Sequence, residues 1–217
     1  MAKLATSAVV LPVLARYLGI EGYGQYAYYL AVLLLASQFA NVGMMQTMTR
    51  RIAERPEDRA WCRSVARSGA LISGAGVMGA GLAAGLLTWR TASHDTAAVP
   101  IALAVVGVLL FDQVWFYARG VLHGFRHEER VAVPGIIGVL MAGSFGVLAA
   151  VTGMGVVGVF VGLLAADIMV AAACLRAVIS ALNGLGLPAS EGSSPLSTGA
   201  MLRFGLSAMV FSVLNMA

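Results

Sequence analysis

Apolar residues run along this chain in long, nearly unbroken blocks that are separated by short polar segments. A helix needs about 20 predominantly apolar residues to cross a bilayer, and about six blocks approach that length. We predict transmembrane helices over residues 5–18, 23–45, 68–89, 99–121, 131–151 and 156–179. A seventh apolar stretch covers residues 201–217. The pattern therefore predicts an all-α, polytopic transmembrane helix bundle.

Composition supports a membrane protein over a soluble one. Of the 217 residues, 59% are hydrophobic and only 11% are charged, whereas a soluble domain carries about 25% charged residues. The 26 glycines would weaken soluble helices, but in membranes they let helix backbones approach closely. The small-xxx-small pairs Gly81/Gly85 and Gly158/Gly162 predict such close contacts.

The distribution of positive charge predicts an orientation. Of the 14 Lys and Arg residues, only Arg16 and Arg90 fall on one side if every predicted helix crosses once. Because Lys and Arg concentrate in cytoplasmic loops, we expect the N-terminus and the arginine-rich loops to be cytoplasmic. This placement accounts for the net charge of +4 without a nucleic-acid partner. The loop arginines are Arg50, Arg51, Arg55, Arg59, Arg63 and Arg67 after the second predicted helix, and Arg119, Arg126 and Arg130 after the fourth.

Residues 183–199 are rich in Gly, Ser and Pro, which is typical of a flexible connection. We expect this segment to be a cytoplasmic linker. It would separate an N-terminal transmembrane bundle, residues 1–182, from the start of a second lobe at residues 200–217.

Motifs for soluble chemistry lack their structural context. Residues 74–79 match GxGxxG, but this dinucleotide fingerprint works at a strand-to-helix turn, and here it lies inside a predicted helix. His123 and His127 are four residues apart, yet a zinc site needs a third ligand, and a solvated helix end explains them better. Cys62 and Cys174 have no CxxC spacing. No hydrolase, zinc-protease or Walker motif is present, so we expect no enzyme activity, cofactor or metal.

Polar residues inside the apolar blocks carry the functional information. Asp112 and Gln113 lie within the fourth predicted helix and Asp167 within the sixth. A carboxylate at the bilayer centre costs about 2.5–3.5 kcal/mol on insertion scales, so it normally faces the bundle interior or a watery cavity. These residues predict a polar lumen for a cation, a proton or a polar head group. The alternative is that they only hold helices together.

Three further residues are candidates for the same cavity. Gln38 and Asn41 are three residues apart in the second predicted helix, so they share one helix face; they either line the cavity or form bonds between helices. Arg16 either points into the cavity or extends to the interface.

Several segments resemble one family, the polysaccharide flippases of the multidrug/oligosaccharidyl-lipid/polysaccharide exporter superfamily. Residues 15–27, Ala-Arg-Tyr-Leu-Gly-Ile-Glu-Gly-Tyr-Gly-Gln-Tyr-Ala, are similar to the junction between the first two helices of that family. Residues 42–54 resemble the end of helix two, and residues 119–126 the end of helix four. Residues 202–206 are similar to the start of helix seven.

The resemblance implies a two-lobe transporter, of which this chain would be the N-terminal portion. It implies that lipid-linked oligosaccharide is flipped across the bacterial inner membrane by alternating access. The implied partners are the bilayer, that lipid-linked substrate and a coupling ion, a proton or sodium. Two alternatives stay open. One is an ion-coupled multidrug exporter of the same superfamily that uses Asp112 or Asp167, and the other is a non-transporting membrane fragment.

Overall fold

The computed structural model describes residues 2–41, 43–92, 98–184, 199, 201–203 and 205. The elements are α1 (Ala2–Asn41), α2 (Met44–Glu54), α3 (Arg59–Ala92), α4 (Ala98–Gly124), α5 (Glu129–Val151) and α6 (Gly155–Gly184). All of these elements are helices, and five of the described helical segments are long and apolar enough to cross a membrane. The prediction of an all-α polytopic bundle is confirmed. Most of the predicted linker and of the seventh apolar stretch lies outside the described residues.

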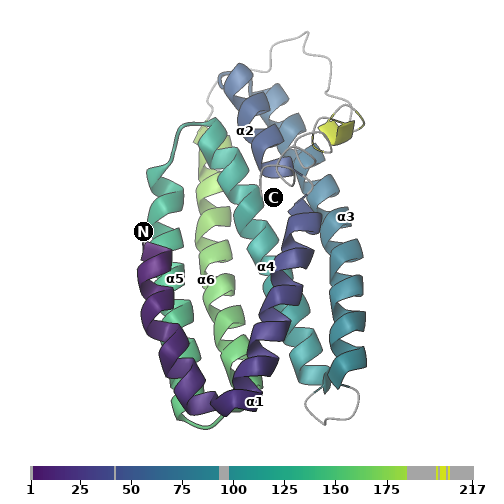
Figure 1. The fold of residues 1–217 in the computed structure, drawn as a ribbon. Coiled ribbons are helices and arrows are strands. Elements are labelled where there is room, and N and C mark those ends of the chain that lie inside the picture. The colour runs from purple at the N-terminus through teal and green to yellow at the C-terminus, as the bar shows by residue number, and fades with distance from the viewer. Residues whose placement is uncertain are drawn as a thin grey trace.

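Helix α1 is folded back on itself. Gly19 breaks the helix with φ 70° and ψ 178°, a conformation that glycine adopts without the steric cost of a side chain. Figure 1 shows the first limb, residues 2–18, running beside α5 to an elbow at Gly19, and the second limb, residues 20–41, returning along α3 and α4. The two limbs of α1 therefore account for both the first and the second predicted transmembrane helices.

The prediction of a loop between the second and third transmembrane helices is wrong. We expected residues 46–67 to form a loop, but α2 covers Met44–Glu54 and α3 already begins at Arg59. The chain leaves α1 through Gly43, which has φ 66°. The 34 residues of α3 span about 50 Å, so α3 extends well beyond a hydrocarbon core of about 30 Å.

Helix α2 forms because its apolar residues have amphipathic spacing. The buried residues Met44, Thr47, Met48 and Ile52 follow the helical i, i+3, i+4, i+8 pattern and so lie on one side of α2. Interspersed arginines obscure that pattern in the sequence. Together α2 and the α4–α5 turn form what we call the arginine-rich end of the bundle. The opposite end, with Gly19 and the α5–α6 turn, is the elbow end (Figure 1).

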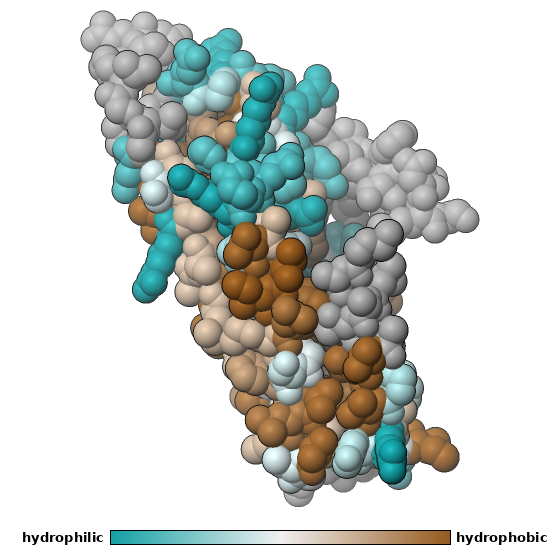
Figure 2. Space-filling model, turned by 90° about the vertical axis from the view of Figure 1, so that its left-hand side faces the viewer, coloured by the Kyte–Doolittle hydropathy of each residue, from teal (hydrophilic) through white to brown (hydrophobic). Residues whose placement is uncertain are grey.

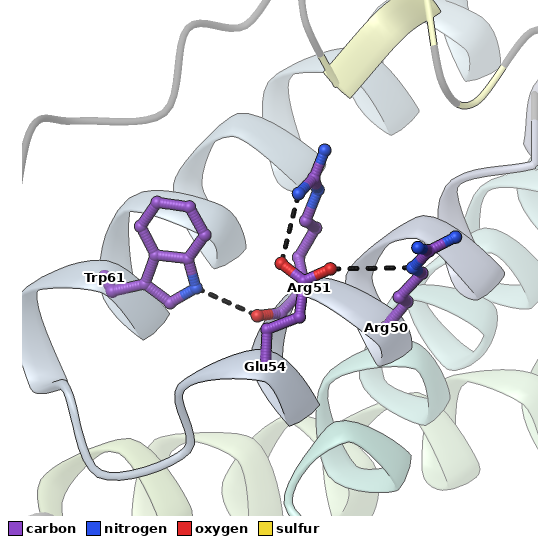
Figure 3. A network of polar contacts seen from close by, with 4 residues as sticks. All are labelled: Arg50, Arg51, Glu54 and Trp61. Carbon is purple, nitrogen blue, oxygen red and sulfur yellow. Dashed lines mark hydrogen bonds and ion pairs between the residues drawn. The ribbon is translucent and has the colours of Figure 1, made fainter.

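A polar network secures α2 to α3 at the arginine-rich end (Figure 3). Glu54 pairs with Arg50 at 3.5 Å and with Arg51 at 3.1 Å. The Trp61 indole N–H donates to the Arg51 carbonyl at 2.9 Å, and the Arg55 guanidinium lies 5.0 Å from the centre of the same ring. One aromatic side chain of α3 therefore anchors the end of α2.

Glycines set the closest helix contacts, as predicted for Gly81/Gly85 and Gly158/Gly162. A Cβ atom on Gly85 would lie 3.3 Å from the Val106 side chain of α4. A Cβ atom on Gly162 would lie 3.1 Å from backbone carbon of Phe145 in α5. Gly120 of α4 makes a further close contact, because a Cβ atom there would lie 3.1 Å from the Met45 carbonyl oxygen of α2.

The outer surface carries large apolar side chains. Leu71, Met78, Leu82 and Leu86 of α3 are each more than 60% exposed, and they follow one another at helical spacing. Figure 2 shows hydrophobic side chains along the middle of one face and a concentration of hydrophilic ones at the arginine-rich end. Exposed apolar side chains on this scale are unfavourable in water but are suited to contact with lipid tails.

The interior divides into two apolar clusters. The elbow-end cluster includes Leu33, Ala84, Leu109, Val159 and Phe160. The arginine-end cluster includes Met48, Val65, Val121, Val170 and Cys174. Between the two clusters, α4 and α6 carry polar residues.

Candidate functional site

The polar residues of α4 and α6 form a layer between the two apolar clusters. On α4, Asp112 and Gln113 lie between Leu109 of the elbow-end cluster and Ala118 of the arginine-end cluster. On α6, Asp167 lies between Phe160 and Val170, which belong to the same two clusters respectively. We refer to Ser37, Asp112, Gln113 and Asp167 as the mid-bundle polar layer.

Ser37 joins α1 to α4 in this layer. Its hydroxyl donates to a carboxylate oxygen of Asp112 at 2.8 Å. The Gln113 amide N–H₂ donates to the Ser37 hydroxyl at 3.0 Å and to the Ser37 carbonyl at 3.1 Å. Ser37 and Gln113 are buried, at 5% and 3% exposure, and Asp112 is half-buried. Interhelical bonds of this kind stabilise the pairing of the second α1 limb with α4.

Asp167 enters the layer from the face of α6 that packs on α4. Asp167 shares one face of α6 with residues that recur at spacings of three or four, namely Phe160, Leu164, Ala171 and Cys174. A Cβ atom on Gly107 of α4 would lie 3.0 Å from the Leu164 side chain, which places this face against α4. Asp167 is half-buried in that position.

The two carboxylates lie at a similar depth. Helices α4 and α6 run in the same direction in Figure 1. Gly107 and Leu164 face each other and mark a common level of the two helices. Asp112 lies five residues after Gly107, and Asp167 lies three residues after Leu164. At 1.5 Å per residue, the Cα atoms of the two aspartates differ in depth by about 3 Å. The fold therefore brings two acidic residues, far apart in the sequence, to one level of the bundle.

The remaining sequence candidates lie in other environments. Gln38 is exposed on the second limb of α1. Asn41 is half-buried, and its side-chain oxygen accepts from the Met45 backbone N–H at 3.4 Å across the break at Gly43. Arg16 is exposed near the elbow, away from the polar layer.

Sequence reasoning missed Ser37. It selected the neighbouring Gln38 together with Asn41, because these two residues are three apart and share one helix face. In a helix, adjacent residues point about 100° apart, and here Ser37 faces α4. The signal that points to Ser37 is its place three residues before the buried Ala40 and four after the buried Leu33, on the apolar face of the limb.

The other sequence motifs lie within α3 and around the α4–α5 turn. Residues 74–79 lie within α3, so the GxGxxG pattern is not at a strand-to-helix turn. His123 lies in the last turn of α4, and the His127 ring lies 3.6 Å from the carboxylate of Glu129, the first residue of α5. Among the described residues, no three His, Cys, Asp or Glu side chains are grouped as a metal site would require.

Two apolar hollows open on the flanks of the bundle. One, of about 680 Å³, lies between the first limb of α1 and α5 and is lined by residues that include Val9, Leu140 and Val147. The second, of about 460 Å³, lies between the second limb of α1 and α3 and is lined by residues that include Phe39 and Gly76. Their lining suits lipid tails rather than a polar solute.

The fold and this layer define a multi-pass membrane protein with ionisable groups inside its helix bundle. The model of the polysaccharide biosynthesis protein family matches residues 1–217, and the chain belongs to that family. Neither the curated proteins nor the solved structures contain a significant match to the chain.

Proposed function

We propose that this chain is the N-terminal lobe of a transporter, not an enzyme, which flips lipid-linked oligosaccharide across the bacterial inner membrane by alternating access. Membership of the polysaccharide biosynthesis family supports the substrate class. The observation that carries transport is the mid-bundle polar layer, with Asp112 and Asp167 at one depth between two apolar clusters. Carboxylates at such a depth are retained where they serve a pathway for ions or polar solutes.

The layer favours a cation or a proton as its direct ligand. Its charged members, Asp112 and Asp167, are both acidic, and its other two members are a hydroxyl and an amide. These groups suit a coupling ion or sugar hydroxyls, and they would repel the diphosphate of a lipid-linked sugar. In this mechanism the layer binds the coupling ion, while the lipid tail stays in the bilayer.

The test is isosteric replacement of the two carboxylates in the native gene. Asp112→Asn and Asp167→Asn keep the side-chain size and remove the charge. Each variant is expected to lose surface polysaccharide in a flippase-deficient bacterium while its abundance in the membrane stays normal. Glu57→Gln is the control, because it makes the same change of a carboxylate to an amide at an exposed residue between α2 and α3. Normal polysaccharide in both Asn variants would reduce the layer to a packing role.

The acidic layer also supports a second candidate, an ion-coupled multidrug exporter of the same superfamily. Drug susceptibility of cells that express the native gene distinguishes the two. The exporter predicts resistance that is lost in Asp112→Asn or Asp167→Asn, without any change in surface polysaccharide.

For the orientation, we propose that the arginine-rich end is cytoplasmic. Neutralising Arg50, Arg51, Arg55 and Arg59 together is then expected to disturb insertion more than transport. Reporter fusions at both ends of the bundle measure this. Unchanged topology would contradict the orientation.

A further inference from the structure

A third hollow, of about 360 Å³, lies at the elbow end and differs from the two apolar ones in its lining. Its walls come from the two limbs of α1 and from the α5–α6 turn. The volume lies within the range of about 300–1,000 Å³ that is usual for small-molecule sites. The lining residues are Tyr17, Leu18, Glu21, Gly22, Gln25, Ala150, Gly153, Gly155 and Val156.

The floor of this elbow hollow is apolar and built into the fold. Ala150 and Val156 are buried, at 4% and 8% exposure. Gly22 lies against the start of α6, because a Cβ atom there would be 3.9 Å from the Val156 side chain. Gly153 and Gly155 both have positive φ angles, 76° and 61°, and they shape the turn that closes one wall. The hollow is thus fixed by backbone geometry.

The rim carries a different chemistry. Tyr17, Glu21 and Gln25 are exposed, and none of them forms a hydrogen bond or ion pair with another described residue. Glu21 and Gln25 are four residues apart, on one face of the second limb, while Tyr17 projects from the first limb. A carboxylate, an amide and a phenol ring therefore border one hollow, and their polar groups have no bonding partner among the described residues.

We infer that the elbow hollow is a saccharide-binding subsite for uncharged, hydroxyl-rich sugars. Sugar hydroxyls would donate to Glu21 and exchange hydrogen bonds with the Gln25 amide, which has both donors and an acceptor. The Tyr17 ring offers an apolar face to the C–H side of a sugar ring and a hydroxyl at its tip. The negative charge of Glu21 disfavours acidic sugars.

This inference rests on the proposed function, which supplies the reason for a sugar site at this end. In the proposed orientation the elbow end faces away from the cytoplasm, so a flipped head group emerges beside the hollow. The apolar flank hollow between the first limb of α1 and α5 contacts the same limb, and it suits the lipid tail of the same molecule.

The experiment is saturation-transfer NMR on the full chain in lipid nanodiscs. The probes are D-mannose, D-galactose, N-acetyl-D-glucosamine and D-glucuronate. We expect saturation transfer to at least one neutral sugar and a weaker signal from glucuronate. Glu21→Gln and Gln25→Ala are each expected to weaken binding and raise the dissociation constant about tenfold. This is the effect of losing one hydrogen bond to a charged or well-placed partner. Tyr17→Leu is expected to abolish transfer to the sugar C–H protons.

The matched control is Glu57→Gln, the same chemical change on an exposed residue between α2 and α3 at the other end of the bundle. It should leave binding unchanged. Absence of transfer to every neutral sugar, or an equal loss in Glu57→Gln, would overturn the subsite.

The outcome separates the subsite from the proposed function. If Asp112→Asn abolishes polysaccharide export but no sugar binds the wild-type chain, the subsite is wrong and the transport proposal stands. If sugars bind at the elbow while the native gene never restores polysaccharide export, the subsite stands and the transport proposal fails.

Discussion

At the arginine-rich end, helices meet through backbone contacts and directed hydrogen bonds. Thr49 donates to the Gly120 carbonyl at 3.1 Å, and Trp61 donates to the Arg51 carbonyl at 2.9 Å. At the elbow end, aromatic rings pack between helices: the ring centres of Tyr26 and Tyr29 lie 5.9 Å and 6.1 Å from that of Phe160. The polar side chains of Tyr17, Glu21 and Gln25 there border a hollow. The difference teaches that directed hydrogen bonds join the helices at the arginine-rich end, whereas the elbow end presents polar groups that are available to a ligand.

The largest effect is expected from Phe160→Ala at the elbow end. Phe160 is fully buried at 0% exposure, and its loss leaves a cavity between α6 and the second limb of α1. We expect the free energy of unfolding to fall by about 3–5 kcal/mol, measured by denaturant titration in mixed micelles. Phe39→Ala removes the same ring from a side chain that is 61% exposed and should change little. Equal losses in the two variants would show that aromatic packing does not hold the elbow end.

A smaller effect is expected from Gly120→Leu at the arginine-rich end. The new side chain would meet the Met45 backbone of α2, which cannot move aside without α2 leaving α4. Overpacking of this kind costs about 1–3 kcal/mol. Unfolding in micelles and protease cleavage after Arg50 or Arg51 both report it. The control is Gly74→Leu, because a Cβ atom on Gly74 has no atom within 4 Å.

Between the two ends, Ser37→Ala tests the mid-bundle polar layer. The change removes the hydroxyl that donates to Asp112 and accepts from Gln113. Hydrogen bonds between membrane helices contribute about 0.6 kcal/mol on average and at most about 1.7, so we expect a loss of about 1 kcal/mol. Ser144→Ala, which removes a bond within one helix, should be neutral. A loss of stability with normal transport would assign Ser37 to structure alone.

The smallest effect is expected from Glu54→Gln. This change removes the ion pairs with Arg50 and Arg51 in Figure 3. The Arg50 and Glu54 side chains are 66% and 37% exposed, so solvent and salt screen the pair and we expect less than about 0.5 kcal/mol. Added salt should abolish even that difference. A loss as large as that of Gly120→Leu would mean that charge, rather than backbone packing, holds α2 in place.

The sequence by itself determined the fold class and most helix positions. A bilayer-length apolar block has one stable solution, a helix with all backbone groups satisfied internally, and the blocks near residues 99–121 and 131–151 became α4 and α5. It also singled out Asp112 and Asp167, because a carboxylate stands out against apolar neighbours. It failed at α2, where the arginines masked the amphipathic spacing of Met44, Met48 and Ile52.

Only the tertiary structure decided which polar residues meet. Ser37, Asp112 and Gln113 are joined across more than 70 residues of sequence, and Asp167 reaches the same depth from α6. The elbow hollow likewise needs both limbs of α1 and the α5–α6 turn. The physical reason is that a helix's own sequence sets its faces, whereas the neighbour that covers each face depends on how all the helices pack together.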